Sequence, residues 1–263
     1  MRQIRFMVIG AHADDCEHIG GLALKYVKTG HKVKFLTTTN GCSGHHEQMG
    51  GTMVRRRQEE ARAVSAKYGV EYDILDFDDG FLTTGIQERL AVLRAIREWA
   101  PDLIVTHRPY DYHPDHRNTS MLVQDCAYLL QVPNVAPLTP VLRYMPVILH
   151  MSDHFQKPIP FSPDLVFDIT SEIDDKSGMY HLYTSQMYEW LPWVGGYLDE
   201  VPKCEGARWE WLRNRRRCDV PESWQAQLAI KYGDREVQYA EALEICEYGG
   251  RLDDEKIAEL FPL

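Results

Sequence analysis

Short apolar runs alternate with longer amphipathic segments through the first half of the chain. Runs of β-branched and other apolar residues predict strands at residues 4–9, 33–38, 72–77 and 103–107. Apolar residues at helical spacing predict helices between them, at residues 19–27, 54–68 and 86–99. Strands and helices that alternate in this way pack as a mostly parallel sheet with helices on both faces. The pattern therefore predicts a Rossmann-like α/β fold.

The second half of the chain is less regular. Residues 133–146 are rich in proline and predict a loop, and strands are expected at residues 147–150 and 165–169. Helices are expected at residues 171–185, 236–246 and 253–260. We predict a single domain over residues 1–263, in which residues 1–150 form the sheet core that carries the site.

Residues 187–224 differ from the rest of the chain in composition. They contain five of the six tryptophans, together with Gly195 and Gly196. We predict an irregular cap or insertion, whose aromatic side chains either pack internally or contact a substrate, with internal packing favoured. The basic run at residues 213–217 lies inside this segment and is predicted to be a solvated loop face.

Composition and charge narrow the possible partners. The chain of 263 residues is 44% hydrophobic, which is enough to bury a large core. Its 29 Lys and Arg against 39 Asp and Glu give a formal net charge of -10, which argues against nucleic acid because phosphate-binding surfaces are basic. No run approaches the roughly 20 apolar residues of a membrane span, and the apolar run near residue 1 lacks the features of a signal peptide. The sequence therefore predicts a cytoplasmic protein that binds neither nucleic acid nor a membrane.

The six cysteines are widely scattered and form no CxxC pair. This spacing favours free thiols in a reducing compartment over a disulfide framework or a zinc knuckle. The six are Cys16, Cys42, Cys126, Cys204, Cys218 and Cys246.

Polar clusters follow four of the predicted strands. AHADD follows the first strand, TNG the second, DFDDG the third and HRPYDYHPDH the fourth. In open parallel sheets, ligands gather beyond the carboxyl ends of the strands. The four clusters are therefore expected to form one shared site.

Two of these clusters carry metal-ligand residues. His12 and Asp15 are three residues apart on the predicted turn after the first strand, and His113 and His116 have the same spacing. One of these two later histidines completes a set of two imidazoles and one carboxylate, which leaves an open coordination position for water. Nitrogen and oxygen ligands in this mixture suit zinc best, although other divalent ions also fit.

The neighbouring polar residues suggest hydrolytic chemistry. Asp14 adjoins Asp15 but points elsewhere, so it is the candidate general base that passes a proton to the leaving amine. With His116 on the metal, His113 is left to stabilise an oxyanion. Asp111 or Asp115 is expected to hold the His113 ring and raise its pKa.

These motifs resemble those of the LmbE-like or PIG-L-like N-deacetylases, zinc enzymes that act mainly on molecules containing N-acetylglucosamine. AHADDCEHIGGLALKYVKTGHKV is similar to the opening segment of that family, and HRPYDYHPDH is similar to its second metal motif. Further similarity lies in RRRQEEARAVSAKYGV, LDFDDGFL, KSGMYHLYTSQ and YAEALE, the last of which resembles a C-terminal helix of the family. Ala13 stands where the family usually has proline, which removes no ligand.

The resemblance implies roles for particular residues. It assigns His12, Asp15 and His116 as zinc ligands, Asp14 as the general base and His113 as the oxyanion-stabilising or acid residue. It further implies that Arg57, or Arg56 if the helix register differs by one, contacts the substrate, with Asp79 at the rim of the site. It also implies a small amino-sugar substrate and a homo-oligomer, either a trimer or a hexamer.

The leading hypothesis is therefore a metal-dependent hydrolase that removes an N-acyl group, acetyl above all, from an amino sugar or a glycoside containing one. An alternative keeps the metal and cleaves a larger amide, such as a sugar–thiol conjugate. A third reading, a non-catalytic sugar- or nucleotide-binding protein, is disfavoured because AHADD stands where a dinucleotide fold needs GxGxxG.

Overall fold

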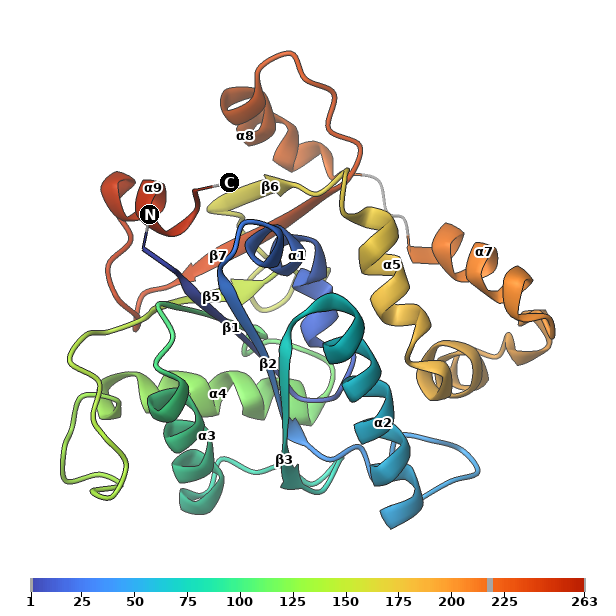
Figure 1. Ribbon diagram of the computed structural model, residues 1–263, viewed down its shortest axis with the longest axis horizontal. Helices are drawn as coiled ribbons and strands as arrows, with labels where there is room; N and C mark the ends of the chain where they lie inside the picture. The colour runs from blue at the N-terminus through green and yellow to red at the C-terminus, as the bar shows by residue number, and fades with distance from the viewer. Residues whose placement is uncertain (1, 217–219, 263) are drawn as a thin grey trace.

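A mixed β-sheet forms the centre of the molecule (Figure 1). The computed structural model describes residues 2–216 and 220–262. In this part of the chain the sheet has seven strands in the order β3-β2-β1-β4-β5-β7-β6. Their bounds are β1 Arg5–Gly10, β2 Lys32–Thr39, β3 Glu71–Phe77, β4 Leu103–Thr106, β5 Val147–Met151, β6 Leu165–Asp168 and β7 Ala240–Cys246. The first five strands run parallel, whereas β7 is antiparallel to both of its neighbours.

Helices cover both faces of the sheet (Figure 1). The α-helices are α1 Gly20–Lys28, α2 Gly50–Tyr68, α3 Ile86–Trp99, α4 Pro114–Leu129, α5 Ile173–His181, α6 Leu191–Val194, α7 Glu205–Arg216, α8 Glu222–Tyr232 and α9 Asp254–Leu260. Shorter turns are the 3-10 helices η1 Cys16–Ile19 and η3 Leu198–Glu200, and the π-helix η2 Gln186–Trp190. No helix among these described residues is both long and apolar enough to cross a membrane.

The alternation of side chains along each strand divides the core into two layers. Phe6 and Val8 of β1 pack in one buried cluster with α1, α2 and α5, whereas Met7 and Ile9 pack in the opposite cluster with α3 and α4. Successive side chains of a strand point to opposite faces, and both faces are covered, so β1 is apolar throughout. The predicted α/β architecture is confirmed.

The sequence predicted most elements in the first half to within a few residues. The helix at residues 86–99 and the four strands before β5 agree with α3 and with β1 to β4. The helix α4 was not predicted, because HPDH was considered only as a ligand motif. In the structure Pro114 is the first residue of α4. A proline fits there because backbone N–H groups in the first turn of a helix have no acceptor within the helix, so the N–H that proline lacks is not needed.

The prediction of a helix at residues 236–246, and with it the helical reading of YAEALE, was wrong. Residues 240–246 form β7, which pairs with β5 on one side and β6 on the other. Tyr239, Ala242, Leu243 and Cys246 have helical spacing, but Ala240 and Ile245 are apolar as well, so the segment is apolar on both sides. Short apolar runs of this kind are typical of strands covered on both faces and cannot be separated from helices by periodicity alone.

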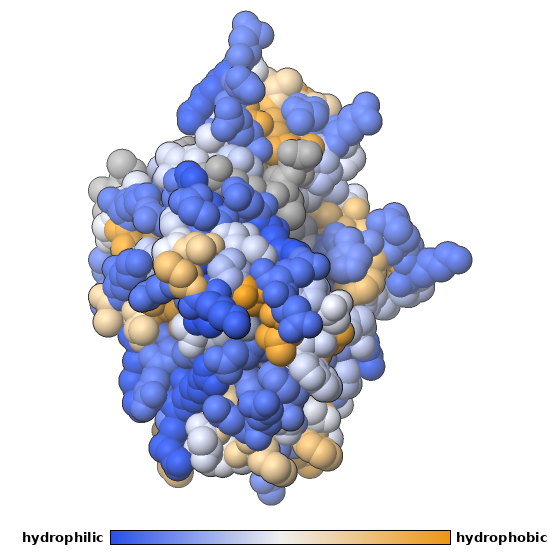
Figure 2. Space-filling view, turned by 90° about the vertical axis from the view of Figure 1, so that its right-hand side faces the viewer, coloured by the Kyte–Doolittle hydropathy of each residue, from blue (hydrophilic) through white to orange (hydrophobic). Residues whose placement is uncertain are grey.

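The segment 187–224 is largely helical, so the prediction that it is irregular was also wrong. It contains α6, η3 and α7 in addition to parts of η2 and α8. Its aromatic residues largely contact each other, as in the stacked pair Trp190 and Trp193 with ring centroids 5.5 Å apart. The basic run ends α7 rather than forming a loop, and Arg217 and Cys218 lie outside the described residues. The face beside α5 and α7 is mainly hydrophilic with small apolar patches (Figure 2).

Glu241 links β7 to the beginning of α1. Its side chain is buried, and its carboxylate accepts hydrogen bonds from the backbone N–H groups of Gly21 and Leu22 at 2.9 and 2.7 Å. Lys176 of α5 donates to the same carboxylate at 2.6 Å. Since Ile19 at the N-cap of α1 has no side chain that accepts such bonds, Glu241 takes over this function from a distant strand.

We expect Glu241→Ala to lower the free energy of unfolding by about 2–4 kcal/mol, because two buried amides and an ammonium group lose a charged partner. Urea denaturation measures this change. Glu247→Ala is the matched control, since Glu247 is exposed on the turn after β7, and its effect should stay within about 0.5 kcal/mol. Equal stability of the two variants would contradict this role of Glu241.

Candidate metal centre and active site

The turn after β1 places two of the candidate ligands. Asp15 Oδ2 accepts hydrogen bonds from the backbone N–H groups of Ala11 and His12 at 2.9 and 2.7 Å, so the chain folds back on itself. A Cβ atom on Gly10 would come within 2.7 Å of the Asp15 side chain, so the close approach requires glycine here. Asp14 has φ 121°, which is a strained backbone conformation for an aspartate.

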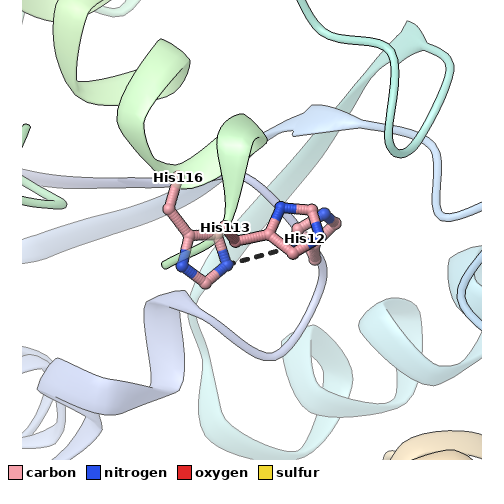
Figure 3. Close-up of side chains that lie close together, drawn as sticks. All are labelled: His12, His113 and His116. Atoms are coloured by element: carbon pink, nitrogen blue, oxygen red, sulfur yellow. Dashed lines mark hydrogen bonds between the residues drawn. The ribbon is translucent and has the colours of Figure 1, made fainter. Parts of the chain in front are cut away.

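Three ligand atoms meet beyond the carboxyl end of the sheet. His12 Nδ1 lies 3.2 Å from His116 Nε2 and 3.4 Å from Asp15 Oδ2, and the last two atoms are 3.4 Å apart. Ligands at about 2.0–2.1 Å from a tetrahedral zinc ion are separated by about 3.3–3.4 Å. Figure 3 shows His12 on the turn after β1 facing His116 near the start of α4. The spacing of these three atoms fits a single metal ion.

Carboxylates behind the two histidines set the direction of their rings. His12 Nε2 lies 3.1 Å from Asp79 Oδ1 and 3.3 Å from Asp115 Oδ2, and His116 Nδ1 lies 3.0 Å from Asp111 Oδ1. A proton on each of these nitrogens leaves the lone pair of the other ring nitrogen directed at the common point. Such carboxylates are the usual partners of metal-binding histidines.

The same carboxylates favour a positive charge on or between His12 and His116. Burial lowers the pKa of His12, but hydrogen bonds to Asp115, Asp15 and Asp79 outweigh it and raise the pKa well above its usual value. For His116, burial is likewise outweighed by Asp15 and Asp111, and its pKa is raised. A cation is therefore favoured where these side chains meet, and a divalent metal ion would supply that charge while leaving both imidazoles neutral.

His107, at the end of β4, supports the ligand Asp15 and was not singled out from the sequence. Its Nε2 atom lies 3.2 Å from both Ala11 N and Asp15 Oδ2, and its ring stacks on that of His116 with centroids 4.2 Å apart. Asp15, His107 and His116 also form a group close enough to hold a metal ion. Because His107 Nε2 is already engaged by the turn that carries Asp15, we assign it to positioning that carboxylate.

Asp14 lies beside the ligands and is paired with a buried arginine. Arg57 Nη2 donates to Asp14 Oδ1 at 2.8 Å, while Arg57 Nη1 donates to Glu60 Oε2 at 2.8 Å and to Ser185 Oγ at 3.2 Å. Burial raises the pKa of Asp14 to about 6, against the lowering effect of the Arg57 charge. A carboxyl group in this range exchanges protons readily near neutral pH, as a general base must.

Comparison with known proteins places this site in a family. Residues 7–127 match the family model PIG-L, described as GlcNAc-PI de-N-acetylase. This range includes β1, β4 and the start of α4, and therefore all three ligand atoms described above. This part of the chain is therefore similar to the PIG-L family. The resemblance inferred from the motifs is thus confirmed.

Several known proteins are similar to this chain over most of its length. The diacetylchitobiose deacetylase of Thermococcus kodakarensis is 26% identical over 202 residues, which cover 72% of this chain and 73% of that protein. The structure of N,N'-diacetylchitobiose deacetylase from Pyrococcus horikoshii matches with a TM-score of 0.69 and 22% identity, covering 93% of this chain and 84% of that one. The 4-carboxy-2-hydroxymuconate hydratase of Pseudomonas putida matches with a TM-score of 0.71 and 20% identity, over 96% of this chain and 99% of that one. The last two likenesses establish the fold.

Asp111 or Asp115 was predicted to hold the His113 ring, but both contact other groups. Asp111 contacts His116, and its Oδ1 accepts the backbone N–H of His113 at 2.9 Å. Asp115 contacts His12 and accepts the backbone N–H of Gly80 at 2.7 Å. Neither carboxylate holds the His113 ring. Burial and the nearby charges of His12 and His116 lower the pKa of His113, so the expected rise in its pKa was wrong.

The residues predicted to contact a substrate are engaged by protein groups. The Arg57 side chain is only 2% exposed and its guanidinium is bound by Asp14 and Glu60, although it lines the cavity beside His12, so its contact with a substrate stays a prediction. Arg56 forms two hydrogen bonds with the Glu189 carboxylate, at 2.7 and 2.6 Å. Asp79 is buried against His12 instead of lying at the rim. The sequence identified these side chains but could not indicate which protein groups they bind.

We expect Asp111→Asn to weaken metal binding about 10- to 100-fold, because an amide holds the His116 imidazole in its metal-binding tautomer less well than a carboxylate. Calorimetric titration of zinc into the metal-free protein measures this. Asp125→Asn is the matched control, since Asp125 lies on α4, the helix that carries His116, but pairs with Arg89 at the surface. Equal zinc affinity in the two variants would show that Asp111 does not orient the ligand.

Proposed function

We propose that this protein is a metal-dependent N-deacetylase that removes acetyl from the nitrogen of an amino sugar or of a glycoside containing one. One observation carries the proposal. His12 Nδ1, Asp15 Oδ2 and His116 Nε2 lie 3.2 to 3.4 Å from each other, and Asp14 lines the same cavity. The similarity to a curated diacetylchitobiose deacetylase supports the same reaction class.

The proposed cofactor is zinc, held by His12, Asp15 and His116. Two imidazoles and one carboxylate form a donor set that zinc accepts readily, with a position left for water or substrate. When bound, such a cation makes water a better nucleophile and polarises the amide carbonyl. A related structure is described as the zinc-inhibited form of teicoplanin deacetylase, so other divalent ions belong in any test.

Asp14 is the proposed general base. It takes the proton of the attacking water and delivers it to the amine that leaves. Arg57 holds Asp14 in place through one carboxylate oxygen and leaves the other free for this transfer. Asp14 has a strained backbone with φ 121° and pairs with Arg57, whereas Asp15 accepts hydrogen bonds from the backbone of its own turn, so we assign the two successive aspartates different functions.

His113 is the proposed stabiliser of the oxyanion. Its Nδ1 atom accepts the backbone N–H of Asp115 at 3.2 Å, which leaves the proton on Nε2. The ring stands edge-on to that of His12, with centroids 4.7 Å apart, and Figure 3 shows the two side chains close together. With its pKa lowered, His113 acts as a neutral hydrogen-bond donor to the carbonyl oxygen rather than as the imidazolium expected from the sequence.

The proposed substrate is a small amino-sugar molecule, and two other reactions deserve a test. Cleavage of a larger amide, such as a sugar–thiol conjugate, uses the same centre. A hydratase reaction is included because the chain covers 99% of the 4-carboxy-2-hydroxymuconate hydratase with a TM-score of 0.71. A trimeric or hexameric assembly and a cytoplasmic location stay predictions.

We expect Asp14→Asn to keep its metal and to lose about 10²- to 10⁴-fold in kcat, because the general base is removed while the ligands remain. His12→Ala should lose both metal and activity. Elemental analysis and acetate release on the purified proteins measure the two properties, and Asp73→Asn at the exposed edge of β3 is the control. Full turnover by the Asp14 variant would exclude it as the base.

We expect acetate release from N-acetylglucosamine, its glycosides or diacetylchitobiose by protein loaded with zinc, cobalt or manganese. A panel of these substrates, a larger sugar–thiol amide and a carboxylated enol substrate separates deacetylase, conjugate amidase and hydratase by their products. Binding of metal without acetate from any acetylated substrate would overturn the proposed reaction. Failure to bind any of the three metals would overturn the centre itself.

A further inference from the structure

The metal centre opens into a cavity whose wall includes a residue of the Trp-rich segment. The cavity has a volume of about 340 Å³ and is lined by Asp14, His116, Tyr180 and Arg216, among others. A second cavity of about 250 Å³ shares Tyr180 and Arg216 and also includes Trp224. Arg216 is therefore in the wall of both cavities and faces the space next to the metal ligands.

Arg216 differs from the other arginines in its surroundings. Arg108 lines the same cavity but pairs with Asp153 at 3.1 Å and donates to the carbonyl of Ile159. On α7, Arg213 pairs with Asp174 at 2.7 Å and Arg215 pairs with Glu200. Among residues 2–216 and 220–262, no acidic side chain forms an ion pair with Arg216.

The contacts of Arg216 hold its guanidinium without neutralising it. The group lies 4.2 Å from the centroid of the Tyr180 ring, and Nη2 lies 2.8 Å from the sulfur of Met187. Stacking and a weak sulfur acceptor leave most of its five N–H donors unused. A positive charge in the last turn of a helix is favourable by itself, but Arg213 and Arg215 already provide it in α7.

We propose that Arg216 binds an anionic group of the substrate, a carboxylate or a phosphate, while the amide lies at the metal centre. This inference rests on the proposed function and narrows its substrate class from amino sugars in general to those that carry an acid. A guanidinium fork matches both kinds of oxyanion through paired hydrogen bonds. It also assigns a function to α7, which packs beside α5 outside the PIG-L match (Figure 1).

Three related compounds test the inference on the zinc-loaded protein: N-acetylglucosamine, N-acetylmuramic acid, which adds a carboxylate, and N-acetylglucosamine 6-phosphate. We expect at least one of the acidic compounds to exceed the neutral sugar by about 10- to 100-fold in kcat/KM, as one charge-assisted contact allows. Arg216→Gln should remove this preference by raising KM for the acidic compound. Arg216→Lys should keep part of it, since the charge remains but the fork is lost.

Arg215→Gln is the matched control, because Arg215 lies one residue earlier and does not line the cavity of the metal centre. It should retain the wild-type preference. Zinc content and the near-ultraviolet circular dichroism of each variant show whether the fold and the centre are intact. A loss of preference in the Arg215 variant equal to that in the Arg216 variant would overturn the assignment.

Calorimetric binding of the amine products, glucosamine, muramic acid and glucosamine 6-phosphate, gives a readout that does not depend on turnover. Tighter binding of an acidic product that requires Arg216, with no acetate formed from any substrate, would support the inference and overturn the deacetylase proposal. Acetate release from all substrates with equal efficiency in wild type and Arg216→Gln would support the deacetylase and overturn the inference. Equal binding of all three products by both proteins would also overturn it.

Discussion

The site depends on the convergence of two imidazoles and a carboxylate from segments about a hundred residues apart. His12 and Asp15 are brought together by a turn in which the carboxylate binds the backbone of its own loop, and His116 comes from the first turn of α4. The parallel pairing of β1 with β4 aligns the ends of these strands and so brings both segments to the same edge. The carboxylates around these three atoms raise the pKa of both His12 and His116, so a positive charge is favoured where the atoms meet.

Around this convergence, each charged group is fixed by another. Asp79 and Asp115 hold His12, Asp111 holds His116, and Arg57 holds Asp14. Buried charges of this kind are costly unless each has a partner, and here the partners also fix the orientation of the candidate site residues. The same ion pairs therefore bear on both the stability of the fold and the geometry of the proposed site.

The sequence predicted the parallel half of the sheet well because its signals are local. Strand-length apolar runs followed by AHADD or HPDH are readable without knowledge of distant residues. The sequence failed where the deciding partner is remote. β7 was predicted as a helix because its periodicity allows both, and only pairing with β5 and β6 decides between them. The ion pairs of Arg57 with Asp14 and Glu60 were not predicted because no local pattern indicates them, and Arg216 was not distinguished from the neighbouring arginines of its basic run.

The position of β7 has a consequence for how the chain assembles during synthesis. β6 is an edge strand whose one neighbour in the sheet is β7, and β7 is inserted between β5 and β6. During synthesis β6 is therefore made before β7, the strand that joins it to the rest of the sheet. The backbone of β6 has no strand to pair with in this sheet until β7 has been made. Because Glu241 belongs to β7, the first turn of α1, which follows the turn that carries the candidate ligands, also acquires its anionic partner only when β7 is made.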